Sequence, residues 1–403
     1  MARVLTRKKK SRTEIPNWEF ELEQGLSSVL TSDLIVEILN RLSTETLITC
    51  KCVCKSWGKL ISDPIFITRF INRSKSLPPS AIITGVFGGK TSVGALPGSS
   101  IGRVSAGVNF CGIGGEIELV DDSLSFLEGA MVVIASDKGY LLCAQNPVFY
   151  FGVGGHVELR HGYRSIVCNP VTKQWRELPK HRRKHNPSSV LFCYDKGLEF
   201  HFKVVSLISF ANYQLEVGTF SSETGKWKES KIYNTEFEHF PYGHNVVFNE
   251  SVCMLGYRHL CAYDLKKQSL SFLELPFLCF IEYSHRCRCL GVSAGSLCIS
   301  MPIGVSLGIW KLVDEGEWFF MHNIDVVSCL KNELQLSHYQ YVHHLVFHPV
   351  NPDIILVRGQ SVLLFNCATR KIESITELKT DEPFIGAVVY CLPAWIPCLK
   401  NAW

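Results

Sequence analysis

The chain repeats one short pattern six times at nearly even spacing, and this repeat limits the possible fold more than any other feature. Each copy has a polar turn followed by an aromatic or large apolar residue that opens a β-type run. The opening residues are separated by 49, 52, 45, 46 and 54 positions and are Phe126, Trp175, Trp227, Phe272, Trp318 and Ile372. Spacings of about 40–50 residues are typical of propeller blades, whereas a sandwich requires no such period. The pattern therefore predicts a mainly β chain whose larger part is a propeller-like all-β domain.

The predicted β domain covers residues 81–399. Short runs of β-branched and aromatic residues alternate there with turns rich in Gly, Asn, Asp and Lys, and no long amphipathic helical pattern occurs. The hexapeptide SLSFLE occurs twice, at 123–128 and 269–274, and GIGGEIEL at 112 returns as GVGGHVEL at 152. These repeated segments support a repeated structural unit, but they do not give the number of blades.

A compact helical pattern precedes this domain, over about residues 28–73. Its first helix is indicated by apolar residues at helical spacing, which are Leu30, Leu34, Ile35, Ile38, Leu39 and Leu42. Thr31 or Ser32 can cap the start of this helix, and Asp33 suits its positive end. A second helical segment is expected from Ser43 onward. The sequence therefore predicts a small helical module in front of the β domain.

Basic charge is concentrated at the N-terminus. Residues 3–12 hold six Lys or Arg and no acid, so the remaining chain has 35 basic residues (41 − 6) against 37 acidic ones. Residues 1–27 are predicted to be a basic, disordered tail. The remainder is nearly neutral and lacks the excess of basic residues that is typical of proteins that bind nucleic acid. The sequence leaves open whether the tail directs nuclear import. Residues 74–80, SKSLPPS, are predicted to be a linker, because two successive prolines prevent a helix from continuing.

The seventeen cysteines are expected to be reduced thiols that pack as small hydrophobic side chains. The apolar segment of a secretory signal does not follow the basic start. The longest uncharged apolar run, 384–399, is interrupted by Pro393 and Pro397 and is too short to span a membrane. We therefore expect a protein of the cytoplasm, the nucleus or both, without a membrane partner.

The stretch CKCVCKSW, residues 50–57, raises the possibility of a metal or redox site. On a single helix Cys52 would lie about 200° from Cys50, so the three thiols could not converge on one ion. No Cys-x-x-Cys pair occurs anywhere in the chain. The residues that would share one helical face are Leu47, Cys50, Cys54, Trp57 and Ile61. This stripe predicts packing and no metal site.

Three other motifs suggest an enzyme but fail on their context. In residues 81–94, only three residues separate Gly85 from the Gly-Lys-Thr, one fewer than a Walker loop requires, and no helix pattern follows. The GVSAG sequence at 291–295 matches a serine nucleophile elbow, but it is followed by a strand-like pattern where the elbow needs a helix. The histidine pairs at four-residue spacing lack the H-E-x-x-H zinc motif and are His181 with His185 and His344 with His348. No catalytic, cofactor-binding or metal-binding residue is predicted.

Residues 30–70 resemble an F-box, the helical module by which substrate receptors dock on a Skp-family adaptor of SCF ubiquitin ligases. The resemblance rests on the apolar positions, the acid–Leu pair at 33–34, the Val-Cys-Lys-Ser-Trp signature at 53–57 and Asp63-Pro64. Two family prolines are replaced, by Thr31 and Ser43, and the family usually breaks the helix near the signature. The resemblance implies that the adaptor is bound by Leu30, Leu34, Ile38, Leu42, Val53, Cys54 and Trp57.

The remainder resembles the F-box-associated domain of plant F-box proteins, through VCNPVTKQWRELP, SSETGKWKES, YDLKKQSLSFLELP and FHPVNPDIILV. Together the two resemblances imply a non-catalytic substrate-recognition subunit. Such a subunit reaches a cullin through the adaptor and holds a target protein for ubiquitin-dependent degradation. They name neither the substrate, nor its degron, nor a small-molecule co-ligand. Two alternatives stay open: a serine hydrolase that uses Ser293, and a β-propeller scaffold without a ligase role.

Overall fold

The computed structural model divides the chain into two compact units, Met1–Lys75 and Ser76–Trp403, which we call the helical unit and the β unit. In the helical unit the structure describes residues 31–42, 44–63, 65–67 and 69–70. In the β unit it describes residues 81–88, 100–103, 105–112, 124, 126–129, 131–145, 148–151, 157–160, 164–170, 173–180, 189–196, 199–211, 214–233, 245–256, 258–276, 288–304, 306–313, 316–325, 328–329, 345–348, 351–358, 361–377 and 384–390. The predicted tail at 1–27, Leu30 and the predicted linker at 74–80 lie outside the described residues.

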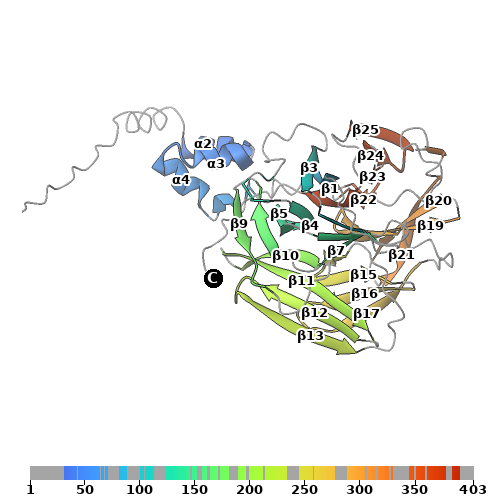
Figure 1. Cartoon of the computed structure of the whole chain (residues 1–403). Helices are drawn as coiled ribbons and strands as arrows, with labels where there is room; N and C mark the ends of the chain where they lie inside the picture. The colour runs from blue at the N-terminus through green and yellow to red at the C-terminus, as the bar shows by residue number, and fades with distance from the viewer. Residues whose placement is uncertain are drawn as a thin grey trace, which may run out of the picture. The chain divides into compact units, whose positions relative to one another are not determined.

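Short helices follow one another in the helical unit (Figure 1), namely α2 (Ser32–Arg41), α3 (Thr44–Cys50) and α4 (Lys55–Ile61). Thr31 is the N-cap of α2, and its Oγ1 accepts a hydrogen bond from the Leu34 N–H at 3.4 Å. This contact satisfies one of the free donors at the start of the helix and confirms the predicted cap. The second helical segment also begins within one residue of its predicted start.

The stripe that was predicted on one helix is divided between two helices. Residues 51–53 form a turn, and Cys54 is extended, at φ −155° and ψ 164°, before α4 begins. Cys and β-branched Val have low helix propensities, so the run of three cysteines and a valine favours a break. The stripe drawn on a single helix is therefore wrong, whereas the break near the signature that the F-box resemblance implied is present. Leu47 and Ile61 are buried as expected, Cys50 and Cys54 are half-buried, and Cys52, which is not part of the stripe, is exposed.

A small apolar core holds these helices together, because helices of seven to ten residues are not stable alone. Its buried members are Leu39, Leu47, Ile61, Phe66 and Phe70, and the rings of the last two stack at 6.3 Å between centroids. Asp63 caps the segment that carries both phenylalanines. Its Oδ1 accepts hydrogen bonds from the N–H groups of Ile65 at 2.7 Å and of Phe66 at 3.4 Å.

The β unit consists mainly of antiparallel sheets, and among its described residues five sheets have four strands each. We call these sheets blades 1 to 5. Blade 1 contains β4 (Met131–Asp137), β5 (Tyr140–Gln145), β8 (Arg164–Asn169) and β9 (Gln174–Glu177). Blade 2 contains β10 (Ser189–Lys196), β11 (Glu199–Ala211), β12 (Gln214–Ser221) and β13 (Lys226–Tyr233). Blade 3 contains β14 (Val246–Phe248), β15 (Ser251–Leu255), β16 (His259–Asp264) and β17 (Leu270–Glu274). Blade 4 contains β18 (Cys289–Ser293), β19 (Ser296–Ile303), β20 (Ser306–Leu312) and β21 (Trp318–Ile324). Blade 5 contains β22 (Leu345–Phe347), β23 (Ile354–Arg358), β24 (Ser361–Asn366) and β25 (Lys371–Glu377).

A three-stranded sheet closes the ring of blades. It joins β26 (Phe384–Tyr390) near the C-terminus to β1 (Ala81–Gly88), and β1 pairs in turn with β3 (Ser105–Gly112). The first strand of each blade contacts that of the next, in the order β4, β10, β14, β18, β22, β26, and β26 contacts β4. A separate three-stranded sheet is made by β2 (Ser100–Arg103), β6 (Val148–Phe151) and β7 (Val157–Arg160). The predicted propeller is thus confirmed, with the two ends of the β unit paired.

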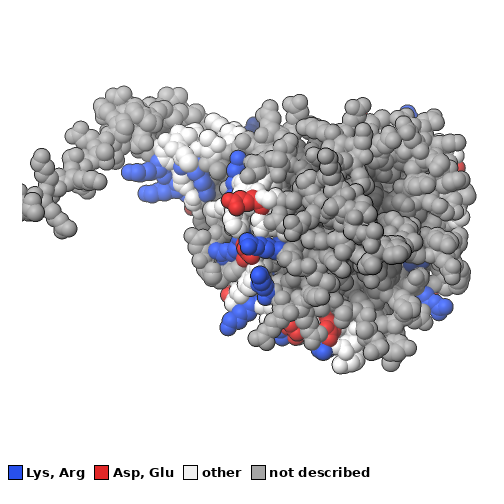
Figure 2. All heavy atoms as spheres, viewed as in Figure 1, with Lys and Arg blue, Asp and Glu red and all other residues white. Residues whose placement is uncertain are grey.

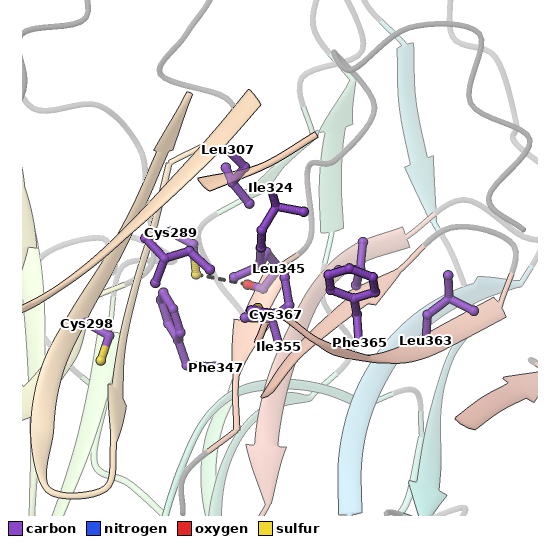
Figure 3. Close-up of a cluster of buried hydrophobic side chains, with 12 residues drawn as sticks. Cys289, Cys298, Leu307, Ile324, Leu345, Phe347, Ile355, Leu363, Phe365 and Cys367 are labelled. Carbon is purple, nitrogen blue, oxygen red and sulfur yellow. Dashed lines mark hydrogen bonds between the residues drawn. The ribbon is translucent and has the colours of Figure 1, made fainter. Parts of the chain in front are cut away.

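The apolar core of the β unit lies between neighbouring blades. Each of four buried clusters combines side chains of two adjacent blades, and we call these clusters seams. Figure 3 shows the seam between blades 4 and 5, where Cys289, Leu307 and Ile324 face Leu345, Phe347 and Phe365. In β15, Val252 and Met254 enter one seam while Cys253 and Leu255 enter the next. Both faces of an inner strand are therefore buried, which explains its near-continuous apolar sequence.

Cysteines of the β unit pack as the sequence predicted. Eight described cysteines are buried, and they are Cys143, Cys168, Cys193, Cys253, Cys261, Cys289, Cys298 and Cys367. Burial raises the pKa of the Cys289 thiol to about 12, and likewise that of Cys367. Such thiols remain protonated at neutral pH and behave as small apolar groups.

The sequence repeat corresponds to the hairpin between the third and fourth strands of each blade. A residue with positive φ stands two positions before an apolar residue of the fourth strand in all five blades. The positive-φ residues are Lys173, Gly225, Gln268, Gly316 and Arg370, and the apolar residues are Trp175, Trp227, Leu270, Trp318 and Ile372. Two predicted anchors are wrong. In blade 3 the equivalent residue is Leu270 and not Phe272, and Phe126 lies in a turn before β4.

Two of these tryptophans connect neighbouring blades by hydrogen bonds. Trp227 Nε1 of blade 2 donates to the Pro179 carbonyl, directly after blade 1, at 2.8 Å. Trp318 Nε1 of blade 4 donates to the carbonyl of Glu274 in blade 3 at 2.9 Å. Each indole therefore fixes the outer strand of one blade to the end of the preceding blade, at the outer rim of a seam.

Replacing Trp227 by Phe should destabilise the β unit by about 1 kcal/mol, because the ring is kept but the hydrogen bond is lost. Trp318→Phe should have a similar effect. Trp175→Phe is the matched control, since that side chain is 50% exposed, and it should change stability little. Urea unfolding of the three variants tests this. Equal destabilisation by all three would show that ring size, and not the hydrogen bond, accounts for the effect.

A carboxylate at the end of β4 in blade 1 accepts a hydrogen bond from the first strand of blade 2. Asp137 ends β4, and its Oδ2 accepts a hydrogen bond from the Cys193 N–H of β10 at 2.6 Å. Burial raises the pKa of Asp137 to about 6, and the hydrogen bond from Cys193 and the charge of Lys138 oppose this rise only in part. The folded state therefore holds this proton more tightly than the unfolded state, whose carboxyl has a pKa near 3.8.

Asp137→Asn should flatten the pH dependence of stability between about pH 4 and 6. In the parent chain, the pKa of Asp137 is higher in the folded state than in the unfolded state. Protonation of Asp137 therefore stabilises the fold fully below about pH 4, and this stabilisation is lost as the pH rises through about 6. Asn keeps an oxygen that can accept from Cys193 but does not titrate. Thermal unfolding of both chains from pH 4 to 7 measures the difference. Parallel curves would show that Asp137 does not titrate in this range.

Candidate functional site

Helix α2 carries apolar side chains on two sides. Leu39 is fully buried in the core of the helical unit. Leu34 and Ile38 are one turn apart, so they share a face, and they are 51% and 46% exposed. The predicted adaptor residue Leu42, the C-cap of α2, is half-buried. The core of this small unit thus uses only part of the apolar surface that α2 offers.

Two further apolar side chains of the helical unit are exposed. Val53 lies in the turn between α3 and α4, and Ile65, at 67%, lies in the capped segment after Asp63. We call Leu34, Ile38, Val53 and Ile65 the exposed apolar set. They make up four of the nine large apolar side chains that are exposed among the described residues. Single exposed apolar side chains are common, but Leu34 and Ile38 adjoin on one face of α2, and adjoining exposed apolar surface typically marks a site that binds another molecule.

The sequence prediction included three of these four residues and missed Ile65. Cys54 and Trp57, which were also predicted to contact the adaptor, are half-buried, and Leu30 is outside the described residues. The missed signal was local: Phe66 and Phe70 are one turn apart and buried, so the neighbour at 65 points elsewhere.

Charged side chains accompany the exposed apolar set. Lys55 and Lys59 are exposed on α4, one turn apart, and Figure 2 shows Lys and Arg side chains next to uncharged ones on the helical unit. On α2, Arg41 forms an ion pair with Glu37 at 2.8 Å. This combination of apolar and basic side chains suits a protein partner with an apolar and acidic surface.

The cysteine triplet has no arrangement that suits a metal. Burial raises the pKa of Cys50, Cys52 is exposed, and Cys54 Sγ lies 3.1 Å from Ser56 Oγ. Throughout the described part of the chain, no three His, Cys, Asp or Glu side chains gather where they could hold a metal ion. None of the helices in the described ranges is both long and apolar enough to cross a membrane.

Ser293 does not have the geometry of a hydrolase nucleophile. It is fully buried at the end of β18, and its Oγ donates a hydrogen bond to the His348 carbonyl of blade 5. The next residues, Ala294 and Gly295, form a tight hairpin with φ 46° and 73° before β19. A nucleophile elbow needs an exposed hydroxyl between a strand and a helix. The GVSAG motif is therefore a turn between strands, as the sequence context predicted.

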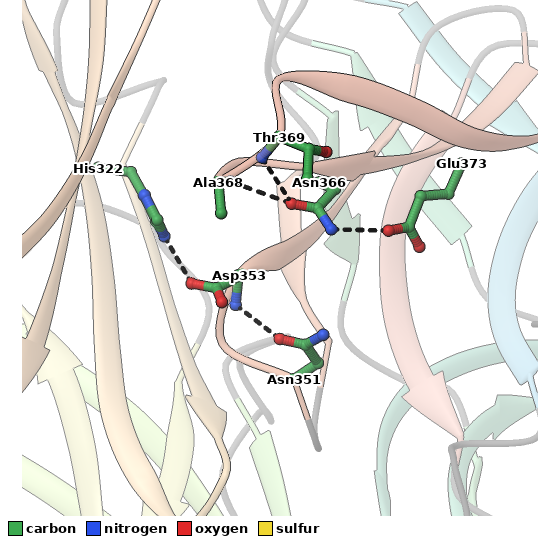
Figure 4. A network of polar contacts seen from close by, with 7 residues as sticks. All are labelled: His322, Asn351, Asp353, Asn366, Ala368, Thr369 and Glu373. Carbon is green, nitrogen blue, oxygen red and sulfur yellow. Dashed lines mark hydrogen bonds and ion pairs between the residues drawn. The ribbon is translucent and has the colours of Figure 1, made fainter.

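The histidines that the structure describes near this serine are part of a connection between blades 4 and 5 (Figure 4). His322 Nε2 of β21 lies 2.8 Å from Asp353 Oδ1 in blade 5. The Asp353 N–H donates to Asn351 Oδ1, and the Asn351 N–H donates to His348 Nδ1, both at 3.0 Å. Burial lowers the pKa of His348. The side chains of His348, Asn351 and Asp353 are thus held by hydrogen bonds between blades and within this part of blade 5.

The remaining sequence motifs cannot be placed. The Gly-Lys-Thr of the rejected phosphate loop and the histidines at 181, 185 and 344 lie outside the described residues. Gly85, the first glycine of that loop, lies inside strand β1. The part of the motif that the structure describes is therefore strand and not a loop that opens a helix.

Comparison with known proteins agrees with both units. Residues 28–69 match the F-box domain, and residues 132–388 match the family described as "F-box protein At3g26010-like, beta-propeller". F-box protein At3g49450 of Arabidopsis thaliana is 25% identical over 257 residues, which cover 62% of this chain and 58% of that relative. Putative F-box protein At4g38870 of the same plant is 22% identical over 338 residues, which cover 78% of this chain and 74% of that relative. The match with At3g49450 thus spans less than two thirds of that relative.

Because the propeller match alone covers more than half of the 403 residues, the chain belongs to the F-box proteins that carry a C-terminal At3g26010-like β-propeller.

Proposed function

We propose that this chain is the substrate-recognition subunit of an SCF ubiquitin ligase. Its F-box docks on a Skp-family adaptor, which connects it to a cullin, and its propeller binds a target protein for ubiquitin-dependent degradation. The single observation that carries the proposal is the exposed apolar set, which lies within the segment that matches the F-box domain. Family membership supports the same role, since F-box proteins are typically non-catalytic ligase subunits.

The proposed adaptor interface combines the exposed set with the residues that position it. Leu34, Ile38 and Val53 contribute apolar surface directly, because each is at least 39% exposed. Half-buried Leu42, Cys54 and Trp57 contact the adaptor with their outer atoms and support the exposed residues from below. Leu30 belongs to this interface by its place before the α2 cap. Burying such side chains contributes about 1.5–3 kcal/mol each, enough for a tight complex.

The receptor itself needs no reactive group. Holding a target near the charged ubiquitin-conjugating enzyme raises the effective concentration of its lysines, which accelerates transfer without chemistry in this chain. The buried thiols and the buried Ser293 agree with such a passive role. We place the protein in the cytoplasm, the nucleus or both, where ubiquitin ligases of this kind act.

Two rival functions make different predictions. A serine hydrolase would require Ser293 to reach a substrate, but its hydroxyl is buried and donates to the His348 carbonyl. A propeller scaffold without a ligase role would leave the exposed apolar set without a partner. Purification of the chain from cells with a Skp-family adaptor and a cullin separates the proposed receptor from both rivals.

Leu34→Ala combined with Ile38→Ala should abolish adaptor binding and leave the fold intact. Both side chains are about half exposed, so truncation removes little core packing, while the complex loses two buried contacts. Co-purification with a Skp-family adaptor should fall by more than about tenfold. Adaptor recovery at the level of the parent chain would contradict the assignment.

Leu39→Ala is the matched control on the same helix. This leucine is fully buried, so its truncation should destabilise the helical unit by about 2–5 kcal/mol. Circular dichroism should show lost helix in this variant and unchanged helix in the double variant. Separate outcomes for the two faces of α2 distinguish lost binding from lost folding.

We expect the helical unit to bind the adaptor and the β unit to bind the target. A fragment of residues 76–403, which follows the boundary between the units, should fold, lose the adaptor and keep the target. Overexpressed in cells, it should lengthen the half-life of the target, because it occupies the target without delivering ubiquitin. Residues 1–75 should bind the adaptor and no target. A shorter half-life, or capture of the target by residues 1–75, would exclude this division.

A further inference from the structure

The outermost strand of blade 4 differs in charge from its counterparts. Strand β21 has the sequence WFFMHNI and contains no Asp, Glu, Lys or Arg. The outermost strands of blades 1, 2, 3 and 5 each contain at least one charged residue, and β13 contains four within KWKESKIY. Charged side chains on edge strands hinder pairing with other chains. Among these five outer strands, β21 is therefore the one without that protection.

Aromatic side chains of β21 are also exposed. Phe319 is 59% and Phe320 47% exposed, and the Phe320 ring lies 5.2 Å from the ring of Trp310. Neighbouring residues on a strand point to opposite faces, so Phe319 and Phe320 lie on the two faces of β21, and the bulge in its pairing with β20 follows Phe320. The strand therefore offers large apolar contacts next to its free edge.

The backbone of β21 leaves hydrogen-bonding groups on that edge. Among the described strands, β21 is the last of its sheet and pairs with β20. The Val313 N–H donates to the Glu317 carbonyl at 2.9 Å. This bond shows that the N–H and C=O groups of Glu317 point towards β20. Since these groups alternate in direction along an antiparallel strand, those of Phe319 also point towards β20, and those of Trp318 and Phe320 point outward.

We propose that the outer edge of β21 binds an extended segment of a partner protein by strand addition. The segment has an apolar centre, which covers Phe319 and Phe320, and basic residues on both sides. The proposal rests on the receptor role proposed above and deepens it, since it assigns the surface and the chemistry by which the propeller takes its target.

Acidic side chains at both ends of β21 select the partner. Exposed Glu317 precedes the strand, and exposed Asp325 follows it. If two copies of this chain paired antiparallel about Met321, Glu317 of each would face Asp325 of the other, and the like charges would repel. A segment with Lys or Arg on its flanks gains attraction at the same two places. The charges therefore favour a basic-flanked partner over a second copy.

The test uses the full chain and a fluorescent, end-capped peptide, Arg-Lys-Val-Thr-Val-Thr-Val-Lys-Arg, followed by anisotropy. Phe319→Thr removes the exposed ring, keeps β propensity and charge, and should weaken peptide binding about tenfold. Tyr233→Thr is the matched control, because Tyr233 is 72% exposed on the outer strand of blade 2. It should bind the peptide as the parent chain does.

Two altered peptides test strand pairing and charge separately. A peptide with its central Val replaced by Pro lacks one backbone donor and should bind at least about tenfold more weakly. A peptide with Glu on both flanks should also bind more weakly, and Glu317→Lys should partly restore its binding. Equal binding of the Pro peptide would overturn strand addition, and failure of Glu317→Lys to help the acidic peptide would overturn the charge selection.

The remaining outcomes are decisive as well. No binding of the peptide by the parent chain, or equal binding by Phe319→Thr, would overturn the proposed edge. A chain that sediments as a dimer and becomes a monomer on Phe319→Thr would show that the edge binds a second copy instead. Adaptor co-purification, measured on the same variants, reports on the F-box alone. In the parent chain, adaptor binding without peptide binding would refute the edge, whereas peptide binding without adaptor binding would refute the receptor role.

Discussion

The packing of each blade against its neighbours is the interaction on which the β unit depends. Every described seam is shared by two blades, so a blade buries its apolar faces only when both neighbours are in place. The contact is close enough to restrict residue size. A Cβ on Gly291 of β18 would lie 2.7 Å from Cδ2 of Phe347 in β22. Pairing of β1 with β26 completes this arrangement, because it joins the two ends of the ring.

This constraint separates structural residues from those available for binding. The indole hydrogen bonds of Trp227 and Trp318 and the His322–Asp353 pair hold blades together, and the hairpin residues with positive φ connect strands within a blade. Motifs that suggested chemistry, such as Ser293, belong to the same framework. Among the described residues, the exposed large apolar side chains include the exposed apolar set of the helical unit and Phe319 and Phe320 of β21. Exposed apolar surface of this kind is suited to contact with other proteins.

The sequence predicted the division into a helical and a β part and the propeller class, because both depend on patterns that repeat. Thr31 could be predicted as a cap because capping depends on neighbours three residues apart. Errors occurred in local geometry. The stripe drawn on one helix is divided by the break at 51–54, and the hairpin register places Leu270 where Phe272 was predicted. The exposure of Ile65 was missed, because the only signal for it was the four-residue spacing of Phe66 and Phe70, which places both rings on the opposite side.

Hydrogen–deuterium exchange of the full chain, with and without a Skp-family adaptor, tests whether the helical unit binds the adaptor. The adaptor should slow exchange in α2, in the turn after α3, in α4 and in the segment after Asp63, where the exposed apolar set and its supports lie. Exchange in the strands of the five blades should not change, because the propeller has no part in this contact. Protection in the blades without protection in α2 would contradict the assignment of adaptor binding to the helical unit.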